Sequence, residues 1–259
     1  MCGILNRYSI ILIIHKGIKK VNIQRLRMKK GILLVIAMVM AVCMLFTGCT
    51  EKTVNLSKVD SDEMQFAQPQ SGDTVATIKT SKGDIKVILY PKYAPLAVEN
   101  FVTHAENGYY DGVTFHRVVE DFIIQSGDPT GTGTGGDSIW NLPFSDEFSD
   151  RLHHYSGALS MVNSGSDTNR SQFFIVTSLP KNITGEIVTL MEEAGWREGI
   201  IDAYKQAGGA PNLDYCYTVF GQVYEGLEVA FAINGVKTDD NDRPKEAVVI
   251  ETIEVTVIE

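Results

Sequence analysis

The run FHRVVEDFIIQSGD, residues 115–128, decides the interpretation of the fold, because it contains parts of two strand-like segments. Side chains alternate between the two faces of a strand, so Ile123 and Gln125 share one face. Arg117 lies in a strand-like segment of Val, Thr and Phe, where a charged side chain needs an acidic partner, a ligand or access to solvent. We therefore expect a binding surface on this face.

A second run, SQFFIVT at residues 171–177, repeats the combination of amide and aromatic side chains. Gln172 and Phe174 share one face there, while Phe173 points the opposite way and can fill a core. The two runs offer an arginine, amides and apolar surface, with no nucleophile, paired acids or metal cluster among them. This combination favours reversible binding over covalent chemistry. For any one of these residues, ordinary packing in a core is the alternative.

The hydrophobic pattern predicts a chain rich in strands from Asp73 onward. The strand-like segments are Val75–Lys79, Ile85–Tyr90, Val113–Val118, Phe122–Gln125, Gly157–Val162, Gln172–Thr177, Tyr217–Val223 and Val249–Val257. A helix is expected after Pro95, which suits a first turn, and Gly226–Ile233 is typical of a second, shorter helix. Eight strands with two core helices favour an all-β barrel with capping helices.

One segment between the strands has helical composition. Within Lys181–Asn212, the helix formers of Glu186–Gln206 are divided by Gly195 and end before Gly208. We expect a helical insertion at about 181–212 that packs on the barrel wall. A role in gating substrate is the alternative.

The charge is distributed unevenly along the 259 residues. Residues 1–48 hold eight basic and no acidic side chains, which leaves a net charge of −17 for residues 49–259. Such an acidic domain is expected to repel nucleic acid and anionic lipid headgroups.

The N-terminus is typical of an export signal. Arg25, Arg27, Lys29 and Lys30 precede a charge-free apolar run, 32–46, that is short for a membrane span. The run ends in LFTGC at residues 45–49, which resembles a bacterial lipobox, although Phe46 stands where leucine is usual. The resemblance implies lipid attachment to Cys49 and cleavage before it. An uncleaved signal anchor is the alternative.

These features divide the chain into four parts. We expect 1–27 to be a non-native extension before a natural start at Met28, 28–48 to be a lipoprotein signal peptide and 49–72 to be a flexible linker. The folded domain is 73–259. The two cysteines left after cleavage, Cys49 and Cys216, cannot form a disulfide once Cys49 carries lipid.

Five separated motifs in this domain resemble those of the cyclophilins, in the order found in that family. They are Phe115-His116-Arg117-Val118-Val119, Phe122-Ile123-Ile124-Gln125-Ser126-Gly127-Asp128, Leu159-Ser160-Met161-Val162-Asn163, Thr168-Asn169-Arg170-Ser171-Gln172-Phe173-Phe174-Ile175 and Val219-Phe220-Gly221. The resemblance implies an eight-stranded antiparallel cyclophilin-like barrel. It also implies peptidyl-prolyl cis-trans isomerase activity without a cofactor or metal.

The resemblance also implies roles for individual residues. Arg117, Gln125 and Phe174 match catalytic positions, with Gln125 orienting the arginine. The matching substrate-binding positions are Phe122, Ile123, Asn163, Gln172, Leu213 and Phe220. Asn212 stands where the family often has tryptophan, which implies weak binding of cyclosporin-type ligands.

The implied partners are polypeptides that contain proline. Because of the lipobox, we expect exported clients, an extracytoplasmic location and attachment to the cell membrane through lipid on Cys49. We expect a monomer that does not bind nucleic acid. The alternative function is a chaperone module that binds proline peptides with little catalysis.

Overall fold

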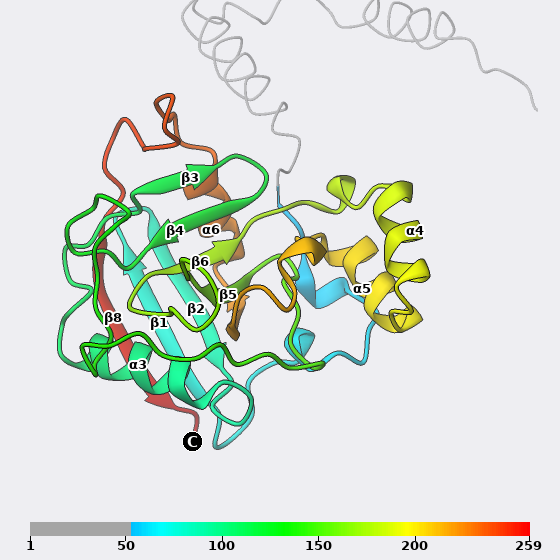
Figure 1. The fold of residues 1–259 in the computed structure, drawn as a ribbon, viewed down its shortest axis with the longest axis horizontal. Coiled ribbons are helices and arrows are strands. Elements are labelled where there is room, and N and C mark those ends of the chain that lie inside the picture. Colours follow the sequence, from blue (N-terminus) through cyan, green and yellow to red (C-terminus); the bar gives the residue numbers. More distant parts are fainter. Residues whose placement is uncertain (1–52) are drawn as a thin grey trace, which may run out of the picture. The chain divides into compact units, whose positions relative to one another are not determined.

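The computed structural model describes residues 53–259, and this part of the chain contains one antiparallel sheet of eight strands (Figure 1). The strands are β1 (Thr74–Thr80), β2 (Gly83–Leu89), β3 (Arg117–Val119), β4 (Ile123–Ser126), β5 (Ala158–Met161), β6 (Phe173–Val176), β7 (Val219–Glu225) and β8 (Ile250–Val257). Their order in the sheet is β3-β4-β6-β5-β7-β2-β1-β8. Each predicted strand corresponds to one of these.

The sheet curls until its two outer strands approach one another. Just before β3, Thr114 forms a bridge with Val249, which directly precedes β8. Backbone hydrogen bonds from Phe115 N to Val248 O, 2.9 Å, and from Ile250 N to Val113 O, 2.8 Å, extend this seam. The expected antiparallel barrel with helices is therefore confirmed.

Four α-helices accompany the sheet in the described residues. They are α3 (Pro95–Glu106), α4 (Gly185–Glu193), α5 (Glu198–Ala207) and α6 (Leu227–Asn234). Helix α3 begins at Pro95, and its first free N–H groups, on Leu96 and Ala97, donate to the Glu147 carboxylate at 3.0 and 2.9 Å. This cap stabilises the helix start and fixes the loop that carries Glu147.

The interior of the barrel is filled by the inward-facing side chains of the strands and by α3. The Phe101 ring of α3 lies 5.4 Å from the Phe173 ring and 5.3 Å from the Phe220 ring, measured between centroids. All three rings are fully buried. Phe173 thus fills the core, as the alternation of its strand predicts.

The predicted helical insertion forms two helices that Figure 1 shows beside the sheet. Helix α4 ends at Glu193, and Gly195 then takes a φ of 77°, so the chain turns where glycine was expected to divide the segment. The inner face of α5, with Ile200, Ile201 and Tyr204, packs against Tyr155 of the barrel in a separate apolar cluster. The insertion therefore packs on the barrel wall.

The predicted flexible linker, 49–72, differs from the structure in the part that is described. Gln65 is buried, and its amide exchanges hydrogen bonds with His153 N, 2.7 Å, and His153 O, 2.8 Å. The same amide donates to Gln222 Oε1 at 2.9 Å. Polar composition suggested a free chain, but a glutamine fixed by three hydrogen bonds attaches this segment to the barrel.

No helix in residues 53–259 is long and apolar enough to cross a membrane. The predicted signal peptide and Cys49 lie outside the described residues.

Candidate active site

A pocket of 890 Å³ opens on the outer face of the sheet. It is lined by His116, Arg117, Phe122, Ile123, Gln125, Thr132, Gly133, Val162, Asn163, Ser164, Phe174, Leu213, Tyr217, Asp239, Asn241 and Arg243. The pocket therefore contains seven of the nine predicted catalytic and substrate-binding residues.

Strand register explains why the central residues meet. Arg117 of β3 lies opposite Gln125 of β4, and Gln125 lies opposite Phe174 of β6. Directly opposed residues of antiparallel strands point to the same face. Three residues that are distant in sequence thus form one row across the sheet.

The row is organised by hydrogen bonds between side-chain amides. The guanidinium Nη1 of Arg117 lies 3.5 Å from Gln125 Oε1, at the upper limit of a hydrogen bond. Gln125 Nε2 donates to Gln172 Oε1 at 2.9 Å, and Gln172 Nε2 donates to the Gly135 carbonyl at 2.8 Å. Because each amide is fixed by its neighbour, Gln125 presents its oxygen, and not its nitrogen, to the arginine.

Gly135 belongs to a loop that is organised by one buried carboxylate. Asp128 accepts hydrogen bonds from the backbone and hydroxyls of Thr130 and Thr132 and from the N–H groups of Gly133 and Gly135. Burial alone would raise the pKa of Asp128, but these hydrogen bonds outweigh it and lower the pKa to about 2. The loop is therefore held at the edge of the pocket by a charged group.

Arg117 keeps access to the pocket while it is held from two sides. Its Nε lies 3.6 Å from Asp242 Oδ2, in the loop before β8, and its side chain is 44% exposed. An exposed ion pair of this length is weak. A ligand in the pocket can therefore meet a cation that is positioned but not neutralised by a tight bond.

The apolar wall faces this cation. Phe122, Ile123, Phe174 and Leu213 pack in one cluster on the outer face of the sheet. The Phe174 ring is nearly parallel to the His154 ring behind it, at 5.9 Å, and meets the Tyr217 ring edge-on at 5.6 Å. The wall is therefore supported by aromatic contacts on more than one side.

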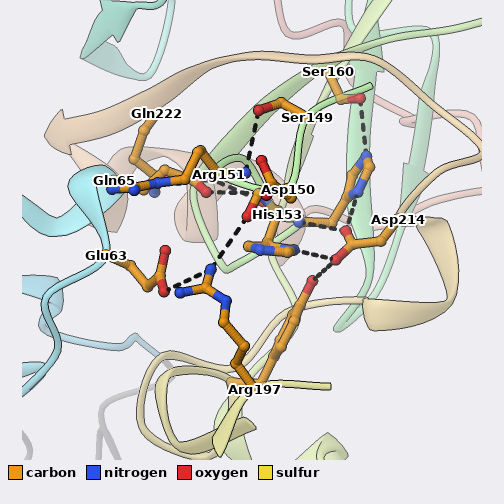
Figure 2. A network of polar contacts seen from close by, with 12 residues as sticks. Glu63, Gln65, Ser149, Asp150, Arg151, His153, Ser160, Arg197, Asp214 and Gln222 are labelled. Atoms are coloured by element: carbon orange, nitrogen blue, oxygen red, sulfur yellow. Dashed lines mark hydrogen bonds and ion pairs between the residues drawn. The ribbon is translucent and has the colours of Figure 1, made fainter. Parts of the chain in front are cut away.

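Behind the wall lies a buried polar network (Figure 2). The carboxylate of Asp214 accepts from Nδ1 of His153 and Nδ1 of His154, both at 2.7 Å. It also accepts from the His154 backbone N–H at 2.8 Å and from the Tyr204 hydroxyl of α5 at 2.9 Å.

This network connects the insertion to the pocket. Desolvation raises the pKa of Asp214, but hydrogen bonds from both histidines outweigh it and leave the pKa lowered. Because Asp214 directly follows Leu213, the network fixes that part of the wall.

Two predicted residues lie outside the pocket lining. Gln172 is buried behind the lining and acts on it through Gln125. Phe220 is fully buried in the barrel interior beside Phe101, so the structure does not place it in a substrate site. The alternation of side chains along a strand predicts that Phe220 points away from the pocket, since its neighbour Val219 packs on the outer face.

Some pocket residues were not predicted as site residues. Tyr217 lines the apolar side, and Asp239, Asn241 and Arg243 line the polar side. Residues 239–242 have three acids and an asparagine, and nothing in this local sequence indicates that it lies beside Arg117.

The arrangement can bind a small apolar ring against Phe174 and direct a guanidinium at it. No group of acidic, histidine or cysteine side chains in residues 53–259 could hold a metal ion. His116, on the pocket lining, is mostly buried, and its burial lowers its pKa, so the neutral ring is favoured at pH 7.

Comparison with known proteins gives a consistent result. Residues 75–255 match the family model described as cyclophilin type peptidyl-prolyl cis-trans isomerase/CLD. A Staphylococcus aureus protein named as a peptidyl-prolyl cis-trans isomerase is 50% identical over 186 residues, which is 72% of this chain and 93% of that protein. A Staphylococcus epidermidis protein with the same name is 48% identical over 186 residues and the same shares of the two chains.

Solved structures resemble the fold as well. A cyclophilin-type peptidyl-prolyl cis-trans isomerase of Cryptosporidium parvum superposes with a TM-score of 0.59 at 30% identity, covering 72% of this chain and 99% of that one. A second structure of that protein, in the presence of the dipeptide Ala-Pro, gives a TM-score of 0.57 at 31% identity and covers 71% and 98%.

Proposed function

The chain belongs to the cyclophilin-type peptidyl-prolyl cis-trans isomerases, and we propose that it uses Arg117 and the wall around Phe174 to rotate X-Pro bonds in exported polypeptides. The dipeptide in the Cryptosporidium parvum structure supports a proline peptide as ligand. The observation that carries the proposal is the row in which Arg117, Gln125 and Phe174 lie on one face.

The physical problem is a barrier, not an equilibrium. Rotation of a peptide bond costs about 18–20 kcal/mol because resonance stabilises the planar amide. For X-Pro bonds the cis and trans forms are close in energy, so only the rate is limiting. A catalyst must therefore stabilise the twisted form.

Each side of the pocket contributes to that stabilisation. An apolar wall around the proline ring disfavours the charge-separated planar imide, which water stabilises. At the twisted transition state the imide nitrogen becomes an acceptor, and the Arg117 guanidinium donates to it. One such contact is worth about 2–4 kcal/mol, by analogy with an oxyanion donor. Immobilising the ring while its neighbour turns must supply the remainder.

An exchange assay on a proline peptide tests this mechanism. Arg117→Ala is expected to lower kcat/KM by about 10²–10³-fold, the usual loss for one charge-stabilising donor. Arg170→Ala is the matched control, because Arg170 is 39% exposed and pairs with Asp137 outside the pocket lining. An Arg117→Ala variant with wild-type kcat/KM would show that the assignment is wrong. A larger loss for Arg243→Ala would transfer the role to that cation.

The same assay addresses the alternative of a binding module with little catalysis. Family membership favours the enzyme. Wild-type protein that binds the peptide without accelerating its exchange would support the module instead.

We further propose that Cys49 carries lipid and holds the domain at the outer side of the cell membrane. Support comes from the basic residues before the apolar run and from the run's end at LFTGC. Metabolic labelling with a fatty acid should mark the wild type and spare Cys49→Ala. Equal labelling of the two proteins would exclude this anchor.

A further inference from the structure

Two aromatic side chains are exposed at one place on the surface. Phe148 is 45% exposed and Tyr215 is 55% exposed, and their rings meet edge-on with centroids 6.4 Å apart. They come from loops that are far apart in sequence. Contiguous exposed apolar surface, unlike single exposed side chains, is typical of a binding site.

This pair adjoins the proposed proline pocket. Phe148 and Tyr215 line a crease of only about 10 Å³ together with Leu152, Tyr217 and Val219, so a ligand would pack on these side chains at the surface. Tyr217 also lines the pocket, and its ring touches Phe174. The apolar surface is therefore continuous from Phe174 to Phe148.

The backbone holds Tyr215 in an outward position. Asp214, the preceding residue, is fixed from inside by His153, His154 and Tyr204 (Figure 2). Tyr215 itself has a φ of 60°, a left-handed conformation that side chains other than glycine adopt at a cost. The fixed backbone therefore sets the direction in which the Tyr215 side chain leaves the chain, and this part of the surface needs little backbone rearrangement to bind a ligand.

The chemistry of the crease favours an apolar ligand. The acid on its lining, Glu147, is occupied at the start of α3, where its two oxygens accept from Leu96 N and Ala97 N. The crease therefore offers ring faces and edges more than free charge. An aromatic side chain can pack against both rings in the edge-on geometry that such rings prefer.

We propose that Phe148 and Tyr215 form a subsite for an aromatic side chain of the substrate, located a few residues from the proline that packs against Phe174. This inference rests on the proposed function. It makes Phe148 and Tyr215 specificity-determining residues, since a polypeptide chain lying across Tyr217 would reach both sites.

A series of peptides tests the subsite. Each peptide contains alanine, one proline and one phenylalanine, and the phenylalanine is moved one position at a time on either side of the proline. At one position, phenylalanine should raise kcat/KM over alanine by roughly threefold to tenfold, the range for one added aromatic contact. In the double variant Phe148→Ala/Tyr215→Asn the ratio should fall to about one. Asparagine tolerates a left-handed backbone, so this variant removes the ring and keeps the turn.

Leu142→Ala is the control for the loss of an exposed apolar side chain, because Leu142 is 67% exposed and lies outside the crease. This control should keep the wild-type preference. The subsite is refuted if the wild type shows no preference for phenylalanine over alanine at any position. It is also refuted if that preference survives in the double variant.

Two further measurements keep the test decisive. If no peptide is accelerated, the proposed function fails, but peptide titrations followed by NMR still test the subsite. In these titrations, phenylalanine must strengthen peptide binding and shift the Tyr215 signals.

Sedimentation tests the other explanation of the exposed rings. If the wild type is a dimer and the double variant is not, the aromatic pair is a contact between two copies of this chain, and the subsite is refuted.

Discussion

Replacement of Asp128 by asparagine tests how the pocket edge is built. In wild type, Asp128 Oδ2 accepts from the N–H groups of Thr132, Gly133 and Gly135 at 3.2, 2.8 and 3.1 Å. An asparagine keeps one oxygen for Thr130 but directs an NH₂ group at these three donors. The three N–H groups then lack an acceptor.

The expected cost follows from these three donors. An orphaned donor costs about 1–3 kcal/mol, and the low end applies because the loop is partly exposed to water. We therefore expect Asp128→Asn to lose about 3 kcal/mol of unfolding free energy. Urea unfolding measures this as a lower midpoint with an unchanged slope. Asp240→Asn, in an exposed loop position, is the control and should shift the midpoint little.

The pH dependence gives an independent check. The folded pKa of Asp128 is lowered from 3.8 to about 2, so its stabilising contribution is present above pH 4 and is lost as the pH falls toward 2. The difference corresponds to about 2 kcal/mol, at 1.36 kcal/mol per pKa unit. The stability gap between wild type and Asp128→Asn should therefore narrow by about that amount between pH 6 and pH 2. A gap below 0.5 kcal/mol at pH 6, or one independent of pH, would refute the reasoning.

Three other substitutions are expected to have separable effects. Gln172→Leu removes the side-chain amide that links Gln125 to the Gly135 carbonyl. It should lower kcat/KM by about tenfold, mainly through kcat, because the loss of one hydrogen bond costs about 1.4 kcal/mol. An unchanged kcat would show that the amide row does not orient Arg117. Tyr204→Phe removes one hydrogen bond to Asp214 and should cost about 1 kcal/mol in urea unfolding, with Tyr224→Phe, at a partly buried tyrosine on the outer cluster, as the control. Asn212→Trp should strengthen a cyclosporin-type ligand from about micromolar affinity by tenfold or more in a fluorescence titration, and an unchanged affinity would contradict our interpretation of Asn212.

The strands were predictable because they are short runs rich in β-branched and aromatic residues, and the central ones, β4, β5 and β6, are buried along their whole length. Parity placed Ile123, Gln125 and Phe174 on one face and Phe173 on the other, and the structure agrees. The divided helical insertion was predictable from Gly195 for a similar reason, since a glycine in a helical pattern acts locally. Features that depend on neighbouring residues in the chain are therefore readable from the sequence.

Features that depend on distant contacts were not readable. The loop before β8 reaches Arg117 only because the sheet curls, and this contact crosses more than a hundred residues of chain. His153 and His154 are adjacent in the chain, and no local signal indicates that both donate to Asp214, some sixty residues away. Phe220 matches a family motif, but it is fully buried in the barrel interior, on the face opposite its neighbour Val219.

The pairing of β1 with β8 has a consequence for biosynthesis. Strand β1 pairs with both β2 and β8, and Thr74 lies opposite Val257, close to the last residue of the chain. A chain that is made from its N-terminal end can therefore form the β1–β2 hairpin early, but one edge of β1 stays unpaired until β8 has been made. Pairing of segments so distant in sequence is slow, and unpaired strand edges promote aggregation.

The barrel is therefore completed only when β8 is available to pair with β1. Deletion of β8 should leave a chain that accumulates as aggregates or degradation products.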